Sequence, residues 1–187
     1  MARQAGYEGA MYPWQSGSNG QEETQLLHLN PRDGTWGADA SRLQRHVNAA
    51  IAYNVWQYHV VTGDREFLSH YGAEMILEIG RFFASRARFD EGAGRYVIEK
   101  VMGPDEYSER YPGAAEPGLR NNAYTNVMAA WVLERALEVL EMLPTARRVE
   151  IAERIGLREE EPARWRDILF RMTVPFHGDG VISQYEG

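Results

Sequence analysis

Two short segments of the chain carry the residue types needed to break a glycosidic bond. Residues Gly103–Tyr107 read Gly-Pro-Asp-Glu-Tyr and place two adjacent carboxylates in a proline-restricted loop. Residues Asn121–Asn126 read Asn-Asn-Ala-Tyr-Thr-Asn and bring amides and hydroxyls to the start of a periodic segment. Glycosidic cleavage needs a carboxylic acid that protonates the departing oxygen, and a nucleophile for the anomeric carbon. The two segments therefore predict a site that protonates and positions a sugar oxygen.

Glu106 is the candidate for that acid. Repulsion from Asp105, if both carboxylates point inward, would favour its protonated form, and the rings of Tyr107 and Tyr111 would reduce its contact with water. The alternative is that Asp105 and Glu106 cap a turn on a solvated loop. Loop composition alone leaves the two interpretations open.

Composition limits the partners of the chain. Its 187 residues, with 44% hydrophobic and 25% charged side chains, fit a single globular piece. A net charge of -7 argues against nucleic acid as a partner. No apolar run approaches the roughly 20 residues of a membrane span, and the first residues do not form a secretory signal. The sequence has no cysteine, and we expect a cytoplasmic protein without a membrane partner.

Hydrophobic periodicity predicts an all-α fold of antiparallel helical hairpins. The first two helices are expected from about Ala40 to Gly63 and from an N-cap at Asp64 to Phe82. The core-facing side chains are predicted to be Leu43, Val47, Ala50, Ile51, Val55 and Tyr58 in the first helix, and Leu68, Tyr71, Met75, Ile79 and Phe82 in the second. The stretch before Pro31 is expected to be mostly loop, with one helical turn near Glu22 to Leu27.

The second half of the chain alternates loop and helix. A turn at Asp90–Gly94, an extended piece at Arg95–Val101 and an irregular loop at Gly103–Leu119 are expected before the next helix. That helix begins near Asn122 and ends before Pro144. It carries two apolar stripes and must be covered on two sides. Shorter helices are expected at about 146–155 and 159–172, before an extended piece at 174–176.

Two further segments accompany the pair described above. Residues Gly9–Trp14 read Gly-Ala-Met-Tyr-Pro-Trp, and Arg45–Val47 leads into Ile51–Tyr58, which reads Ile-Ala-Tyr-Asn-Val-Trp-Gln-Tyr. In this order the four segments resemble glycoside hydrolase family 65, the family of maltose, trehalose and kojibiose phosphorylases and related α-glucosidases. The resemblance runs from about Gly6 to the end of the chain.

The resemblance implies an (α/α)6 barrel catalytic domain, of which residues 1–187 would form a central piece and Glu106 would be the general acid. It implies inverting cleavage of an α-glucosidic bond in a disaccharide of the trehalose, maltose or kojibiose type, with a mild preference for trehalose. Inorganic phosphate is the nucleophile in the phosphorylases of the family, and water is the nucleophile in the hydrolases. No metal or organic cofactor is expected.

The candidate substrate-binding residues each have a structural alternative. They are Trp14, His46, Asp105, Asn121, Asn122 and Tyr124. Trp14 either stacks on a sugar or fills the core, and His46 either contacts the site or is an ordinary core histidine. The two asparagines are most simply helix-capping residues, and Tyr124 either meets the ligand or packs under the loop.

Three features depart from the family pattern. Ser108 stands where histidine is frequent, Arg120 stands where an acidic residue is common, and the stretch Tyr111–Leu119 is long. Segments that the family uses upstream for glucose binding and downstream for phosphate binding are not found in residues 1–187. We therefore expect these residues alone to be catalytically incompetent. If water attacks, the second carboxylate that an inverting enzyme requires is not identified.

A non-catalytic helical module remains the rival interpretation, since 5 Trp, 10 Tyr and 6 Phe would also suit binding of carbohydrate or protein. Association into a homodimer through an uncovered apolar face is open as well. Glu106 discriminates between the classes, because a binding module has no use for an acid at that position.

Overall fold

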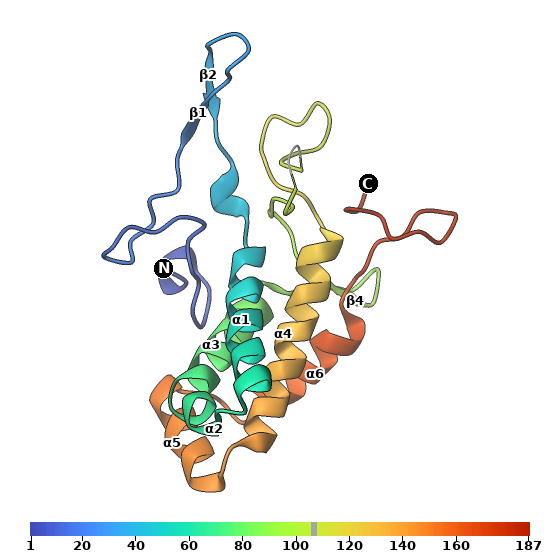
Figure 1. Ribbon diagram of the computed structural model, residues 1–187. Helices are drawn as coiled ribbons and strands as arrows, with labels where there is room; N and C mark the ends of the chain where they lie inside the picture. The colour runs from blue at the N-terminus through green and yellow to red at the C-terminus, as the bar shows by residue number, and fades with distance from the viewer. Residues whose placement is uncertain (106–107) are drawn as a thin grey trace.

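The computed structural model describes residues 1–105 and 108–187, in which helices form a bundle with long loops at one end (Figure 1). The helices are α1 (His46–Thr62), α2 (Arg65–Phe67), α3 (Ala73–Arg86), α4 (Ala123–Met142), α5 (Thr145–Ile155) and α6 (Glu161–Arg171), with 3-10 turns η1 (Arg3–Ala5) and η2 (Ser41–Leu43) and a π turn η3 (Leu68–Gly72). Two antiparallel hairpins pair β1 (Leu27–Leu29) with β2 (Trp36–Ala38) and β3 (Arg88–Asp90) with β4 (Arg95–Val97). The expectation of a mainly helical fold is confirmed.

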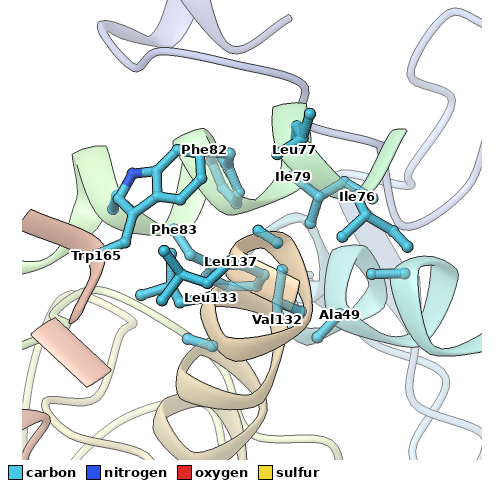
Figure 2. Packing of buried hydrophobic residues seen from close by; sticks show 14 of the residues in the cluster. Ala49, Ile76, Leu77, Ile79, Phe82, Phe83, Val132, Leu133, Leu137 and Trp165 are labelled. Atoms are coloured by element: carbon cyan, nitrogen blue, oxygen red, sulfur yellow. The ribbon is translucent and has the colours of Figure 1, made fainter. Parts of the chain in front are cut away.

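The helix α4 is the centre of the bundle. It packs against α1, α3 and α6, and Val132, Leu133 and Ala136 have no exposed surface. Gly80 of α3 lies close to α4, since a Cβ added there would lie 3.2 Å from the Cβ of Ala136. Phe82, Phe83 and Trp165 complete this packing (Figure 2). Burial on two sides, as predicted, is confirmed, although the apolar Val127 near the start of the helix is exposed.

The predicted core faces of the first two helices are partly wrong. Asp64 caps α2 by accepting a bond of 2.8 Å from the Phe67 N–H, as expected. However, Tyr58 is 47% exposed and Tyr71 is 67% exposed. In α1, apolar residues occur all round the helix, so spacing did not identify the buried side, which includes the polar Asn48 and His59. In the second helix, the π turn η3 inserts an extra residue into one turn and rotates Tyr71 out of the predicted stripe.

The helical turn expected near Glu22 to Leu27 is wrong, because Glu22 forms a bridge with Ser16 and a β-hairpin begins at Leu27. The strands β1 and β2 pair with Leu29 opposite Trp36, and the turn closes through Asn30 and Gly34, whose φ is 72°. The Gly34 N–H donates to the Asn30 carbonyl at 2.9 Å. Strand side chains here are largely exposed, so the segment shows no apolar alternation by which to recognise it. The turn at Asp90–Gly94 is confirmed, although its partner strand β3 was missed.

The loop end of the bundle is formed by three parts of the chain. These are the β1–β2 hairpin, the described residues of the acid loop (103–105 and 108–119) and the C-terminal segment (173–187), all beyond the same ends of α1 and α4 (Figure 1). The base of the acid loop is closed by Val101 and Leu119, whose backbone groups exchange bonds of 3.3 and 2.7 Å. Helices α5 and α6 lie near their expected ranges, and α4 ends before Pro144. Within the described residues, no helix combines the length and hydrophobicity that crossing a membrane would require.

Arg81 connects α3 to α5 and α6 from a buried position. Its Nε donates to Glu161 at 3.0 Å, and its terminal nitrogens donate to the Ile155 carbonyl at 2.6 Å and the Gly156 carbonyl at 3.2 Å. The carbonyls at the end of α5 thereby gain donors that the helix itself does not supply. The arrangement fixes the two C-terminal helices against the core.

We predict that Arg81→Met lowers the free energy of unfolding by about 3 to 5 kcal/mol, because the buried carboxylate of Glu161 loses both of its bonds to the Arg81 guanidinium. Arg154→Met is the matched control, since Arg154 pairs with Glu74 and Glu150 at the surface. Exposed pairs contribute little, so this control should leave the urea midpoint nearly unchanged. Equal midpoints for the two variants would contradict the assignment.

Candidate active site

Three rings converge at the loop end of the bundle. The ring centroid of His46 lies 5.8 Å from that of Trp14 and 5.8 Å from that of Tyr124. His46 is the first residue of α1, Tyr124 lies in the first turn of α4, and Trp14 comes from the N-terminal segment. That segment is held to α1 because the Tyr12 N–H donates to the Asn48 side chain at 2.6 Å. Residues distant in sequence thus form one aromatic wall.

Exposure separates the roles that these rings can play. Trp14 is 38% and Tyr124 is 47% exposed, whereas His46 is 8% exposed. The alternative in which Trp14 fills the core is therefore wrong. Aromatic faces of this kind suit the apolar side of a sugar ring, with the indole N–H and phenol O–H available to hydroxyl groups. Contact with a sugar stays a prediction for all three residues.

The surroundings of His46 favour the neutral form of its imidazole. Burial lowers the pKa of its imidazole, and the charge of Asp105 partly offsets this effect. Its Nδ1 atom is buried and has no hydrogen-bond partner among the described residues. A neutral imidazole can both donate and accept a hydrogen bond. His46 is thus suited to a neutral hydroxyl group.

The acid loop brings Asp105 to the same place. The Gly103 N–H donates to the Ser108 carbonyl at 3.0 Å, which holds the described residues on each side of the motif together. An added Cβ on Gly103 would lie 2.7 Å from the Cβ of Ser108, so this approach requires glycine. Glu106 and Tyr107 lie outside the described residues. The role of Glu106 as the acid therefore remains a prediction.

The start of α4 is organised by two asparagines with different tasks. Asn122 caps the helix by accepting from the Thr125 N–H at 3.0 Å, as expected. Asn121 is fully buried with a φ of 50°, a conformation that asparagine tolerates better than most residues. Its Oδ1 accepts from the Ile98 N–H at 3.1 Å and from Asn126 at 3.0 Å. Capping is thus confirmed for Asn122. It is wrong for Asn121, whose side chain instead connects Ile98, the residue after β4, to α4.

Sequence reasoning missed the residues that fix the rim of the site. Arg120 forms ion pairs with Asp90 at 2.5 Å, with Glu99 at 3.3 Å and with Glu186 at 3.0 Å. The Tyr111 hydroxyl donates to the Glu186 carbonyl at 2.6 Å. Arg120 is therefore occupied by carboxylates of its own chain and anchors the loop. In the sequence, Arg120 stood out only because an acidic residue is common at its position in the family that the chain resembles. No sequence pattern linked Arg120 to Glu186.

A metal site finds no support in the described part of the chain, where no three His, Asp or Glu side chains gather in a way that would hold an ion. The local chemistry is that of carboxylates, amides and aromatic rings. Such a set recognises hydroxyl groups and transfers protons.

Comparison with known proteins identifies the family of the chain. The model of the "Glycosyl hydrolase family 65 central catalytic domain" matches residues 1–187. The chain belongs to glycosyl hydrolase family 65. The match covers all four of the motif segments together, which confirms the resemblance seen in the sequence.

Family 65 relatives match the chain along its whole length. It is 54% identical, over 100% of its residues, to an uncharacterized glycosyl hydrolase of Mycobacterium tuberculosis, of which the match covers 14%. It is 46% identical to the trehalose 6-phosphate phosphorylase of Lactococcus lactis, covering 98% of the chain and 22% of the relative. It is 38% identical to the kojibiose phosphorylase of Halothermothrix orenii, covering 100% of the chain and 24% of the relative. The chain thus spans about a quarter or less of these curated relatives.

The fold agrees with that of a solved family structure. A putative kojibiose phosphorylase from the human microbiome superimposes with a TM-score of 0.77 at 22% identity, covering 98% of the chain and 22% of that protein. The expected fold class, part of an α/α barrel with little β structure, is confirmed.

For this family 65 site we predict that the imidazole of His46 titrates below the ordinary value of 6.5. Asp105→Asn should lower the midpoint further, because the variant removes the negative charge that stabilises the imidazolium. The measurement is an NMR titration of the histidine rings, with His46→Gln used to assign the signal. A midpoint at or above the ordinary value, or one unchanged by Asp105→Asn, would contradict the geometry.

Proposed function

We propose that the chain contributes the acid side of the active site of an inverting phosphorylase that cleaves an α-glucosidic bond in a disaccharide. The observation that carries the proposal is the convergence of Trp14, His46 and Tyr124 beside Asp105, the residue directly before Glu106. The names of the phosphorylases among its relatives support phosphate as the nucleophile. Trehalose or its 6-phosphate is the preferred substrate type.

Each group has a defined task in the proposed reaction. Glu106 donates its proton to the bridging oxygen while the bond from that oxygen to the anomeric carbon breaks. An oxygen of inorganic phosphate forms the new bond to that carbon from the opposite face, so an α-glucoside gives β-glucose 1-phosphate. Trp14 and Tyr124 hold the sugar, and the neutral His46 bonds a hydroxyl group. No metal or organic cofactor takes part in these steps.

The first test measures turnover by the complete polypeptide that carries this sequence. Trehalose, trehalose 6-phosphate, kojibiose and maltose are each supplied with and without inorganic phosphate. We expect glucose 1-phosphate to form from one of them only when phosphate is present. Release of glucose alone, independent of phosphate, would replace the phosphorylase by a hydrolase. Residues 1–187 alone are expected to be inactive, because they span a quarter or less of the relatives.

We predict that Glu106→Gln lowers kcat by a factor of about 10² to 10⁴, because the amide cannot protonate the leaving oxygen, and preserves binding of the disaccharide. Glu109→Gln is the matched control from the same loop, since Glu109 lies 3.8 Å from the guanidinium of Arg110 and is given no task in the reaction. Sugar binding by a wild-type protein that shows no turnover would instead favour the non-catalytic module.

A further inference from the structure

The side-chain amide of Gln184 joins the C-terminal segment to the acid loop. Its Nε2 donates to the carboxylate of Asp105, and it donates to the Ser108 hydroxyl at 2.9 Å. Asp105 comes directly before Glu106 in the sequence, and Ser108 follows it by two positions. One amide thus contacts the described residues on each side of the proposed acid.

The backbone of Gln184 is fixed to the start of α4. Its carbonyl oxygen accepts from the Ala123 N–H at 3.0 Å and from the Asn122 side chain at 3.2 Å. The Ala123 N–H belongs to the first turn of α4, where N–H groups lack partners within the helix. Gln184 therefore bridges a rigid helix start and the loop, and its position is set by the helix.

The residues around Gln184 hold it in place. The Ser183 N–H donates to the Pro175 carbonyl at 2.9 Å, and the Glu186 N–H donates to the Arg120 carbonyl at 3.1 Å. The rings of Tyr111 and Tyr185 pack edge to face with centroids 5.6 Å apart. The C-terminal segment is thus attached on both sides of Gln184, and these contacts fix the backbone from which the Gln184 amide reaches the loop.

We propose that Gln184 is a positioning residue for the general acid. Through Asp105 and Ser108 it fixes the described residues on each side of position 106 relative to the start of α4, which is the arrangement that proton transfer by the general acid requires. This role rests on the proposed function. It differs from sugar binding, because its bonds go to the loop and to α4.

The test uses Gln184→Met in the complete polypeptide, which keeps the length of the side chain and removes its donors. Two substrates are compared: the disaccharide, whose leaving oxygen needs a proton, and 2,4-dinitrophenyl α-glucoside, whose leaving group needs little help. We expect kcat to fall about 10²-fold on the disaccharide, the loss typical of a misplaced catalytic group. The rate on the aryl glucoside should fall by about tenfold or less, because departure of this leaving group depends little on the acid.

Gln25→Met is the matched control, because the Gln25 amide also donates to a carboxylate, that of Asp39 at 2.5 Å, and neither residue is given a task in the reaction. It should leave both rates unchanged. Gln184→Glu, close to the wild type in shape but without the donor, is a second variant and should show the same selective loss.

Several results would overturn the positioning role. Equal losses on both substrates would indicate general damage to the fold, and a rise in KM with kcat intact would indicate contact with the sugar. Unchanged rates would show that the bonds of Gln184 are dispensable. Wild-type turnover is measured in parallel and tests the proposed function separately, so an inactive wild type would remove both proposals, whereas an active one isolates the role of Gln184.

Discussion

The loop end of the bundle depends on the hydrogen bonds of one buried side chain, the amide of Asn121. Its oxygen accepts from the Ile98 N–H and from Asn126, and its nitrogen donates to Glu186. Three segments therefore meet at one side chain: the exit of the β3–β4 hairpin, the first turns of α4 and the C-terminal segment. A buried amide left without these partners would cost about 1 to 3 kcal/mol per orphaned group. Because the Asn121 amide needs these partners, it favours the one arrangement in which the three segments meet.

The junction links a rigid scaffold to a site made of loops. Helix α4 is packed on α1, α3 and α6, so the positions of Asn122 and Tyr124 at its first turn are set by the core. His46 is set in the same way by α1. The acid loop has little core of its own. It is bonded to the C-terminal segment, and Gln184 of that segment is in turn bonded to the start of α4. Placing chemistry on loops that a packed scaffold holds is a general arrangement for enzymes.

Sequence predicted what local chemistry determines. The cap at Asp64, the end of α4 before Pro144 and the turn at Asp90–Gly94 all follow from single residues with strong backbone preferences. The resemblance of four ordered segments also gave the family. Faces of helices were less predictable. Tyr71 is exposed because a π turn changes the helical repeat, and apolar spacing carries no signal for that change.

Contacts between distant residues could not be predicted from one sequence. Glu186 meets Arg120 and Asn121 across more than sixty positions, and Gln184 meets Asp105 across a similar separation. No local pattern encodes such pairs, because each follows from the packing of the whole chain. The convergence of Trp14, His46 and Tyr124 was only partly foreseeable, since the motifs named the residues and the fold brought them together.

The most direct test of the account is a crystal structure of the complete polypeptide, with Glu106→Gln to prevent turnover and a disaccharide bound. The account predicts that the side chain at position 106 lies about 3 Å from the bridging oxygen, within hydrogen-bond reach. The same sugar should contact Trp14 and His46. A bound disaccharide remote from these rings, with the side chain at position 106 directed into solvent, would contradict it.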